Sequence, residues 1–267
     1  SFMQEKPIHN KYNGNKNTKN KNFNRHRSTH KNYKNTKHNK TIDTKVYALG
    51  GLNEIGKNMY CVEHDNEIII IDAGVKFAEE GLPGIDYVIP DYSYLKRNEN
   101  KIRGLLITHG HEDHIGGIPF LLQVVKIPFI YASPLACAMI TRKLEEKRLT
   151  NATHLIRIDD EYQIKTKYFN IGFFKTNHSI PESLGIIINS PNGRIVSTGD
   201  FKFDLTPVGD PADFQKMSFL GETGVTLLLS DSTNAEVPTF SKSEKQVAYA
   251  VQEEFRKTEG RLIVATF

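Results

Sequence analysis

The chain has 267 residues, with 35 Lys and Arg against 31 Asp and Glu, which gives a formal net charge of +4 at pH 7. This length suits one or two domains, and the sequence lacks both an apolar signal-peptide core and an apolar run long enough to span a membrane. The two cysteines, Cys61 and Cys137, form no CxxC pair, so we expect both to be small buried side chains with reduced thiols. This is typical of a cytoplasmic protein, and we expect no membrane partner.

The first 43 residues differ from the rest in composition and are predicted to form a disordered basic extension. Residues 1–42 hold eleven Lys or Arg, ten Asn and four His, but a single acid, Glu5. So few apolar side chains cannot offset the entropy of ordering the chain. The remaining residues carry 24 bases and 30 acids, a net charge of −6. The extension is therefore either an element that attracts phosphates or a solubilising tail.

From residue 44 onwards, short apolar runs alternate with helical patterns, which predicts a layered α/β core. Two or three strands are expected between residues 149 and 170, and the other strands over 46–49, 59–62, 67–71, 102–107, 127–131, 172–175, 184–188, 193–197, 225–229 and 261–265. Helices are expected over 92–97, 115–125, 134–148 and 242–257.

Polar side chains follow the apolar strands at the points where the strands end. This holds for Asp72, the cluster that begins at His109, His178, Asp200 and Asp231. Loops at one edge of a layered core bring such residues together while the strands hold them in place. The spacing therefore predicts one shared site.

The segment 109–114 places His109, His111, Asp113 and His114 within six residues. Imidazole and carboxylate ligands without a thiolate suit zinc or manganese. His178 and Asp200 are weaker candidates by themselves, since a lone histidine is more often structural and a Gly-Asp pair is common in turns.

The motif HxHxDH, written here as HGHEDHIGG at 109–117, resembles the signature of metallo-β-lactamase-fold hydrolases and, in this form, that of β-CASP ribonucleases of the RNase J family. The resemblance covers residues 45–267 and includes ALGGLNEIGKNMY at 48–60, IDAG at 71–74, GIDYVIPDY at 84–92, NHSIPES at 177–183, STGDFKFD at 197–204 and SDSTN at 230–234. It implies a metallo-β-lactamase αβ/βα sandwich, whose first and larger part spans 44–234, and the start of a β-CASP cap domain over 235–267.

The resemblance implies two divalent transition-metal ions, zinc or manganese, in one site. His109, His111 and His178 would bind the first ion, Asp113 and His114 the second, and Asp200 would bridge both. Two such cations activate a water molecule and stabilise charge on phosphoryl oxygens.

Three further roles follow from the same resemblance. Asp72 corresponds to the family's strand-end aspartate, which is expected to orient the cluster. Asp231 corresponds to the first acidic motif of the cap family, although it could equally cap the turn at Ser232-Thr233. Gly84 and Asp86 could hold a structural calcium ion, and a simple acidic turn is the alternative.

The implied activity is hydrolysis of single-stranded, 5′-monophosphorylated RNA by 5′-to-3′ exonuclease and endonuclease action, in RNA maturation and decay, including rRNA processing. One alternative is a hydrolase of small esters or thioesters on the same fold, against which SDSTN and the helix at 242–257 argue. Another is an RNA-binding scaffold with an inert metal site.

In the RNase J family, later segments carry a last histidine ligand and a motif that binds the terminal phosphate, and no residue here matches either. The resemblance therefore implies a longer, homo-oligomeric protein, and little activity for these 267 residues by themselves.

Overall fold

The structure is a computed structural model that describes residues 42–78 and 82–265, and these belong to one compact unit. The extension predicted over 1–43 lies almost wholly outside the described residues, so its disorder stays a prediction. Cys61 and Cys137 are both buried free thiols, as expected. Of the helices in the described ranges, none combines the length and the apolar character that crossing a membrane requires.

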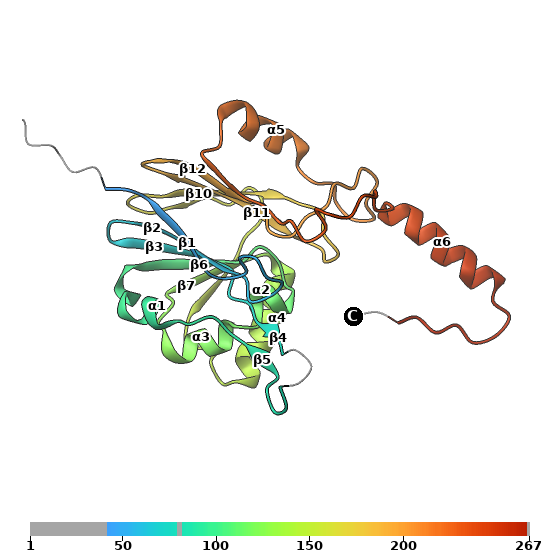
Figure 1. Cartoon of the computed structure of the whole chain (residues 1–267), viewed down its shortest axis with the longest axis horizontal. Coiled ribbons are helices and arrows are strands. Elements are labelled where there is room, and N and C mark those ends of the chain that lie inside the picture. Colours follow the sequence, from blue (N-terminus) through green and yellow to red (C-terminus); the bar gives the residue numbers. More distant parts are fainter. Residues whose placement is uncertain (1–41, 79–81, 266–267) are drawn as a thin grey trace, which may run out of the picture. The chain divides into compact units, whose positions relative to one another are not determined.

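A six-stranded sheet forms the first half of the fold, in the order β1-β2-β3-β6-β7-β8 (Figure 1). Its strands are β1 (Lys45–Gly50), β2 (Met59–His64), β3 (Glu67–Ile71), β6 (Ile102–Leu106), β7 (Phe129–Ala132) and β8 (His154–Arg157). The first two pairings are antiparallel, and those from β3 through β8 are parallel. All five residues of β3 are buried, because the sheet is covered on both faces.

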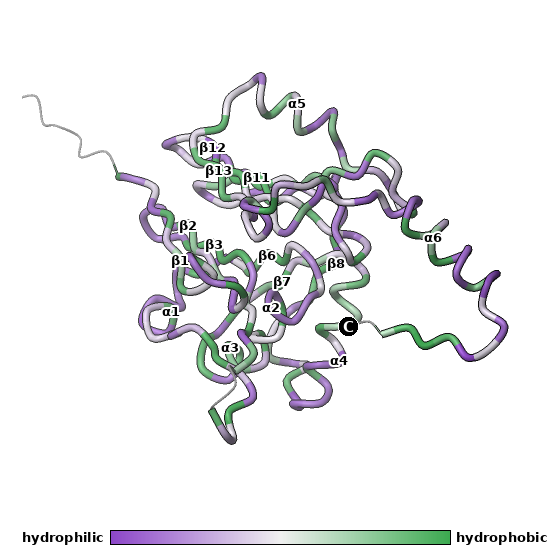
Figure 2. Tube along the Cα trace, turned by 45° about the vertical axis from the view of Figure 1, so that its right-hand side comes forward, coloured by the Kyte–Doolittle hydropathy of each residue, from purple (hydrophilic) through white to green (hydrophobic). Residues whose placement is uncertain are grey.

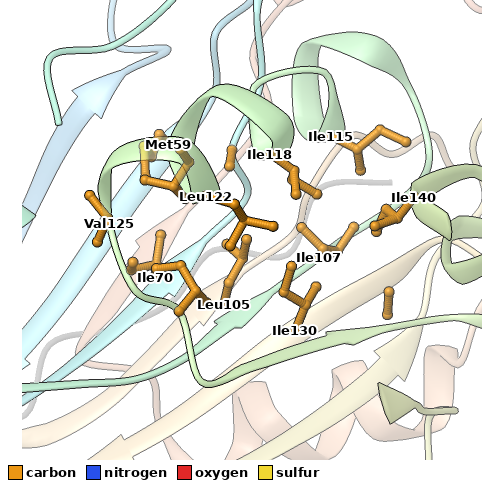
Figure 3. Packing of buried hydrophobic residues seen from close by; sticks show 14 of the residues in the cluster. Met59, Ile70, Leu105, Ile107, Ile115, Ile118, Leu122, Val125, Ile130 and Ile140 are labelled. Atoms are coloured by element: carbon orange, nitrogen blue, oxygen red, sulfur yellow. The ribbon is translucent and has the colours of Figure 1, made fainter. Parts of the chain in front are cut away.

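One face of this sheet packs against the helices that connect its strands. These are α1 (Ser93–Arg97), a 3₁₀ turn (Glu99–Lys101), α2 (Glu112–Ile115), α3 (Ile118–Val124) and α4 (Pro134–Glu146). Figure 3 shows Ile70, Leu105 and Ile130 of the sheet meeting Leu122 of α3 and Ile140 of α4. This buried cluster fixes the helices on the outer face of the sheet.

The other face packs against a second sheet, in the order β13-β12-β11-β10-β9. Its strands are β9 (Ile164–Lys165), β10 (Asn170–Lys175), β11 (Leu184–Ser190), β12 (Gly193–Ser197) and β13 (Leu227–Leu229). Residues such as Ile69, Phe173 and Ile186 form one core between the sheets. Leu220 of α5 (Phe214–Thr223) packs on the outer face of the second sheet, which completes the αβ/βα sandwich.

Two smaller elements lie outside the sandwich. The strands β4 (Lys76–Phe77) and β5 (Tyr87–Val88) form a two-stranded hairpin. The last helix, α6 (Glu244–Lys257), begins with a capping box between Ser243 and Gln246, and apolar and charged residues such as Val247 and Glu253 are exposed along it. Figure 2 shows the mixture of hydrophobic and hydrophilic residues along this helix. Its assignment to a cap domain that starts at residue 235 stays a prediction.

Several elements differ from the sequence-based expectation, among them the β4–β5 hairpin, which was not predicted. The helix expected over 115–125 is divided into α2 and α3, because Gly116 and Gly117 lie against the loop after β3, where the Gly117 N–H donates to Ala73 O at 2.8 Å. Helix α5 was not predicted. The strand predicted over 261–265 is wrong, since this exposed apolar segment pairs with no strand in residues 42–78 and 82–265.

Candidate metal centre

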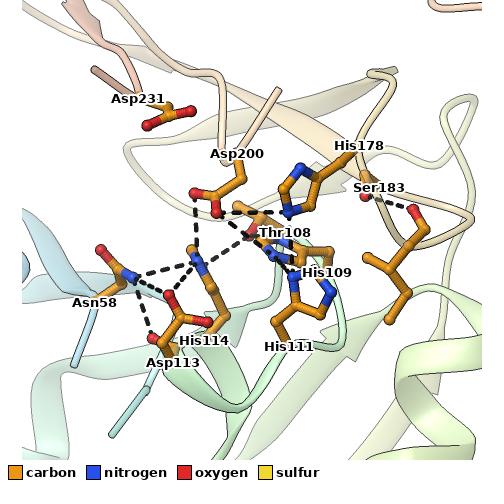
Figure 4. Close-up of polar contacts among 12 residues, drawn as sticks. Asn58, Thr108, His109, His111, Asp113, His114, His178, Ser183, Asp200 and Asp231 are labelled. Atoms are coloured by element: carbon orange, nitrogen blue, oxygen red, sulfur yellow. Dashed lines mark hydrogen bonds and ion pairs between the residues drawn. The ribbon is translucent and has the colours of Figure 1, made fainter. Parts of the chain in front are cut away.

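Five strands end at the same place in the fold, and each is followed by a polar side chain that the sequence analysis singled out. They are Asp72 after β3, His109 after β6, His178 after β10, Asp200 after β12 and Asp231 after β13. Figure 4 shows His109, His111, His114, His178 and Asp200 facing one another, with Asp113 beside His114. The predicted convergence of strand ends is therefore observed.

Main-chain hydrogen bonds join the loops that carry these side chains. Asn58 N donates to Asp113 O at 3.0 Å, and Ala73 N donates to His114 O at 2.8 Å. On the other side, Lys202 N donates to Asn177 O at 2.8 Å, which ties the loop of His178 to that of Asp200. The relative placement of the loops thus depends on backbone groups as well as on side chains.

The first group of candidate ligands consists of His109, His111 and His178. His111 Nδ1 lies 3.1 Å from His109 Nε2 and 3.1 Å from His178 Nε2. Asp200 Oδ2 lies 3.5 Å from His178 Nε2 and 4.0 Å from His109 Nε2. Three imidazole nitrogens and one carboxylate oxygen therefore surround one point.

The second group consists of His109, His114 and Asp200, and Asp113 lies beside it. Asp200 Oδ1 lies 3.3 Å from His114 Nε2, and Asp113 Oδ2 lies 3.4 Å from the same nitrogen. Asp200 thus turns one carboxylate oxygen toward each group, which is the arrangement that a bridging ligand requires.

The separations between donor atoms match those around a small cation. With bonds of about 2.0–2.1 Å to nitrogen, the donors of a tetrahedral zinc ion lie about 3.3–3.4 Å apart. The separations from 3.1 to 4.0 Å in the two groups lie on both sides of that value. Imidazole and carboxylate donors suit zinc and also manganese, so the residues present fit two divalent transition-metal ions.

Asp72 and Thr108 determine which nitrogen of two histidines is free to bind a metal. Asp72 Oδ2 lies 2.8 Å from His114 Nδ1 and also accepts a hydrogen bond from the Thr108 hydroxyl at 2.8 Å. Since Thr108 donates its only hydroxyl proton to Asp72, it accepts from His109 Nδ1 at 3.0 Å. Both histidines then carry their proton on Nδ1 and turn an unprotonated Nε2 to the ligand groups.

Burial and charge have opposite effects on these two histidines. Burial lowers the pKa of His109 far below its usual range, and the neighbouring histidines lower it further, so its imidazole is neutral. Burial alone would also lower the pKa of His114, but Asp72, Asp113 and Asp200 outweigh it and raise that pKa well above the usual value. The carboxylates around His114 therefore favour positive charge at this side of the cluster, and a cation bound at His114 Nε2 would supply that charge in place of a second proton.

Two cavities flank the cluster. One, of about 620 Å³, is lined by Asp113, His114, Asp200 and Asp231 together with the loop at 51–58. The other, of about 810 Å³, is lined by the segment 175–184, which includes His178, and by Val247 of α6. The candidate metal ligands therefore lie between two open spaces.

Two predicted site features have a less direct relation to the cluster. Asp231 borders the same cavity as Asp200, but its Oδ1 accepts hydrogen bonds from Thr233 N at 2.8 Å and Thr233 Oγ1 at 2.7 Å, as a turn-capping residue does. Gly84 and Asp86 lie on an exposed turn, and neither belongs to a ligand cluster found in the described ranges. A role for Asp231 and a calcium ion at Gly84 and Asp86 stay predictions.

Sequence reasoning missed two residues of this site, Thr108 and Asn58. Thr108 could have been found from its place between a buried strand and His109, where a hydroxyl faces the same space as the ligands. Asn58 carries no such signal, because the residue that it contacts, Asp113, lies 55 positions further along the chain.

An αβ/βα sandwich with histidines and aspartates at its strand ends agrees with the sequence comparison, in which residues 52–229 match the metallo-beta-lactamase superfamily. The chain belongs to this superfamily. It is 57% identical over 222 residues to Ribonuclease J 1 of Streptococcus pyogenes serotype M3, covering 83% of this chain and 40% of that protein. It is 46% identical over 224 residues to Ribonuclease J of Mycoplasma genitalium, covering 84% and 39% of the two chains.

The chain thus spans about 40% of the length of the curated relatives that it matches. Among solved structures, a protein of unknown function from Enterococcus faecalis V583 aligns with a TM-score of 0.57 at 15% identity, covering 81% of this chain and 58% of that one, which is a likeness of fold alone. The predicted fold and the resemblance to ribonuclease J are confirmed.

Proposed function

We propose that the protein is a metal-dependent ribonuclease that hydrolyses RNA phosphodiester bonds by 5′-to-3′ exonuclease and endonuclease action. The observation that carries the proposal is the pair of ligand groups that share Asp200, in a chain 57% identical to Ribonuclease J 1 of Streptococcus pyogenes. A hydrolase of small esters is the weaker candidate, since the relatives reported above are ribonucleases by name.

His109, His111 and His178 would hold the first cation, Asp113 and His114 the second, and Asp200 both. Bound there, two zinc or manganese ions would supply a water of lowered pKa and positive charge beside the phosphate. Asp72 keeps the His114 proton on Nδ1, and Thr108 does the same for His109. Because strands and main-chain bonds hold these groups, little reorganisation is needed when charge develops on the phosphate.

The substrate that we propose is single-stranded RNA with a 5′-monophosphate. The two cavities beside the cluster support an extended polymer, because a chain can occupy both spaces while one phosphate lies at the metal ligands. Four further parts of the proposal rest on similarity to ribonuclease J. They are the preference for a 5′-monophosphate, the role in RNA maturation and decay, including rRNA processing, the cytoplasmic location and the homo-oligomeric state.

The test compares two substrate classes on full-length protein loaded with zinc or manganese. A 5′-monophosphorylated oligoribonucleotide should be cleaved, a chelator should abolish cleavage, and p-nitrophenyl acetate should be hydrolysed no faster than in buffer. The variant His109→Ala should lose cleavage, whereas His154→Ala, an exposed histidine of β8 outside the cluster, should keep it. Ester hydrolysis without RNA cleavage would overturn the proposal in favour of a small-molecule hydrolase.

A further inference from the structure

The side chain of Asn58 contacts the second ligand group without belonging to it. Its amide nitrogen donates to Asp113 Oδ2 at 3.2 Å and to Asp113 O at 3.2 Å, and it lies 3.2 Å from His114 Nε2. The amide nitrogen therefore faces two oxygens of Asp113 and one nitrogen of His114, which are two candidate ligand residues.

The main chain of Asn58 is held as firmly as its side chain. Its N–H donates to Asp113 O at 3.0 Å, and its carbonyl accepts from Gly74 N at 3.0 Å, beside β3. The residue therefore connects the end of one strand to the loop that carries Asp113.

The loop before Asn58 leaves room for this side chain. A Cβ on Gly51 would lie only 2.5 Å from Asn58 Oδ1, and Gly51 also has a φ of +86°, which disfavours any other residue. Tyr60 fixes the same glycine, since its hydroxyl donates to Gly51 O at 2.8 Å. Gly51 thus lies close to the carbonyl side of the Asn58 amide, while the nitrogen faces Asp113.

We propose that Asn58 is a positioning residue that orients the Asp113 carboxylate beside His114 and so sets the affinity of the second metal ion but not of the first. The inference rests on the proposed metal ligands. A neutral amide suits this task, because it can direct a carboxylate by hydrogen bonding without adding charge or competing strongly for the cation.

The physical consequence is a difference between the two ions. Without the Asn58 amide, Asp113 Oδ2 keeps its 3.4 Å contact with His114 Nε2 but loses the hydrogen bond that restrains it from the other side, so the carboxylate can rotate more freely. Loss of such an outer partner typically lowers metal affinity about 10- to 100-fold. His111 and His178 make no recorded contact with Asn58, so the first ion should be unaffected.

The test is a competition titration of full-length protein with zinc and a chromophoric chelator, which resolves two binding steps. The variants are Asn58→Ala and Asn58→Leu, of which the second keeps the number and branching of the side-chain heavy atoms but is bulkier and has no hydrogen-bond donor. Both should weaken one zinc step about 10- to 100-fold and leave the other within about twofold. The variant His178→Ala identifies the step that belongs to the first ion.

Leu52→Ala is the matched control, because Leu52 lies in the same loop with 69% of its surface exposed, and both of its zinc steps should equal those of the wild type. Three outcomes would overturn the inference while leaving the proposed function intact. They are wild-type zinc affinities in both Asn58 variants, equal weakening of both zinc-binding steps, and weakened zinc binding in Asn58→Ala alone. A wild-type protein that binds no zinc or manganese would overturn both. Thermal unfolding reports whether each variant is folded, and loss of folding in both would make Asn58 a structural residue only.

Discussion

Asp72 Oδ2 lies 2.8 Å from His114 Nδ1, and both side chains are buried, so this pair fixes the tautomer of a candidate metal ligand. In Asp72→Asn, an amide N–H facing Nδ1 would move the histidine proton to Nε2, where it competes with the metal. We expect zinc affinity at the second site to fall about 10- to 100-fold, measured by competition titration. Asp43→Asn, at an exposed position, is the control, and an unchanged affinity in Asp72→Asn would contradict this role.

Removal of Asp200 should affect both metal ions, because its two oxygens face different ligand groups. In Asp200→Ala, elemental analysis of the purified full-length protein should show lower occupancy of both sites. Asp210→Ala removes an aspartate outside the cluster whose side chain is 81% exposed, and should leave the metal content unchanged. Normal metal content in Asp200→Ala would remove Asp200 from the site.

Glu67 stabilises the fold far from the cluster. It accepts hydrogen bonds from Thr166 Oγ1 at 2.6 Å, Arg103 Nε at 2.9 Å and Tyr168 N at 3.1 Å. Burial alone would raise the pKa of Glu67, but these hydrogen bonds outweigh it and lower the pKa. We expect Glu67→Gln to reduce the free energy of unfolding by about 1–3 kcal/mol at pH 7.

The sign of the pH dependence follows from the lowered pKa of Glu67. The stabilisation is complete above the unfolded value of about 4.3 and is lost as the pH falls through the folded value. The stability gap between wild type and Glu67→Gln, measured by urea unfolding, should therefore narrow below about pH 4. Glu259 is exposed, so Glu259→Gln should have the same unfolding free energy as the wild type at every pH. If the difference in unfolding free energy between wild type and Glu67→Gln stayed constant below about pH 4, the charge of Glu67 would contribute nothing to stability.

Residues 1–42 should add affinity for RNA that depends on salt and not on sequence, since their eleven Lys and Arg can neutralise phosphates and release counterions. Deleting them should flatten the slope of log affinity against log salt concentration. Unrelated oligoribonucleotides of equal length should lose affinity equally. An unchanged slope would leave the extension as a solubilising tail.

The sequence predicts the core of the cluster well because its chemistry is local. His109, His111, Asp113 and His114 follow one buried strand within six residues, so one short segment, a loop and the helix α2, carries them all. His178 and Asp200 are weak candidates by themselves and are proposed from the resemblance to the RNase J family and from their place after other strands, and the structure brings both to the same point. The alternation of apolar runs similarly predicted most strands of both sheets.

The remaining features depend on contacts between distant residues, which no local pattern encodes. Thr108 acquires its role from Asp72, 36 positions away, and Asn58 from Asp113. Helix α5 has ten residues, and its apolar residues Phe214, Met217 and Leu220 share their short segment with Phe219, which is exposed, so the helical period is blurred. The apolar segment 261–265 resembles a strand in sequence, but a strand also needs a partner.

The main-chain hydrogen bonds among the loops of the site have an evolutionary consequence. Bonds such as Ala73 N to His114 O do not depend on side-chain identity, so substitutions at exposed positions other than glycine in these loops leave them in place. Exposed positions like Leu52 and Ile55, which border a cavity beside the candidate ligands, are then free to vary while the cluster keeps its shape. Related proteins could therefore change the substrates that they select through substitutions at the exposed edge of this cavity alone, without losing the ability to bind metal ions.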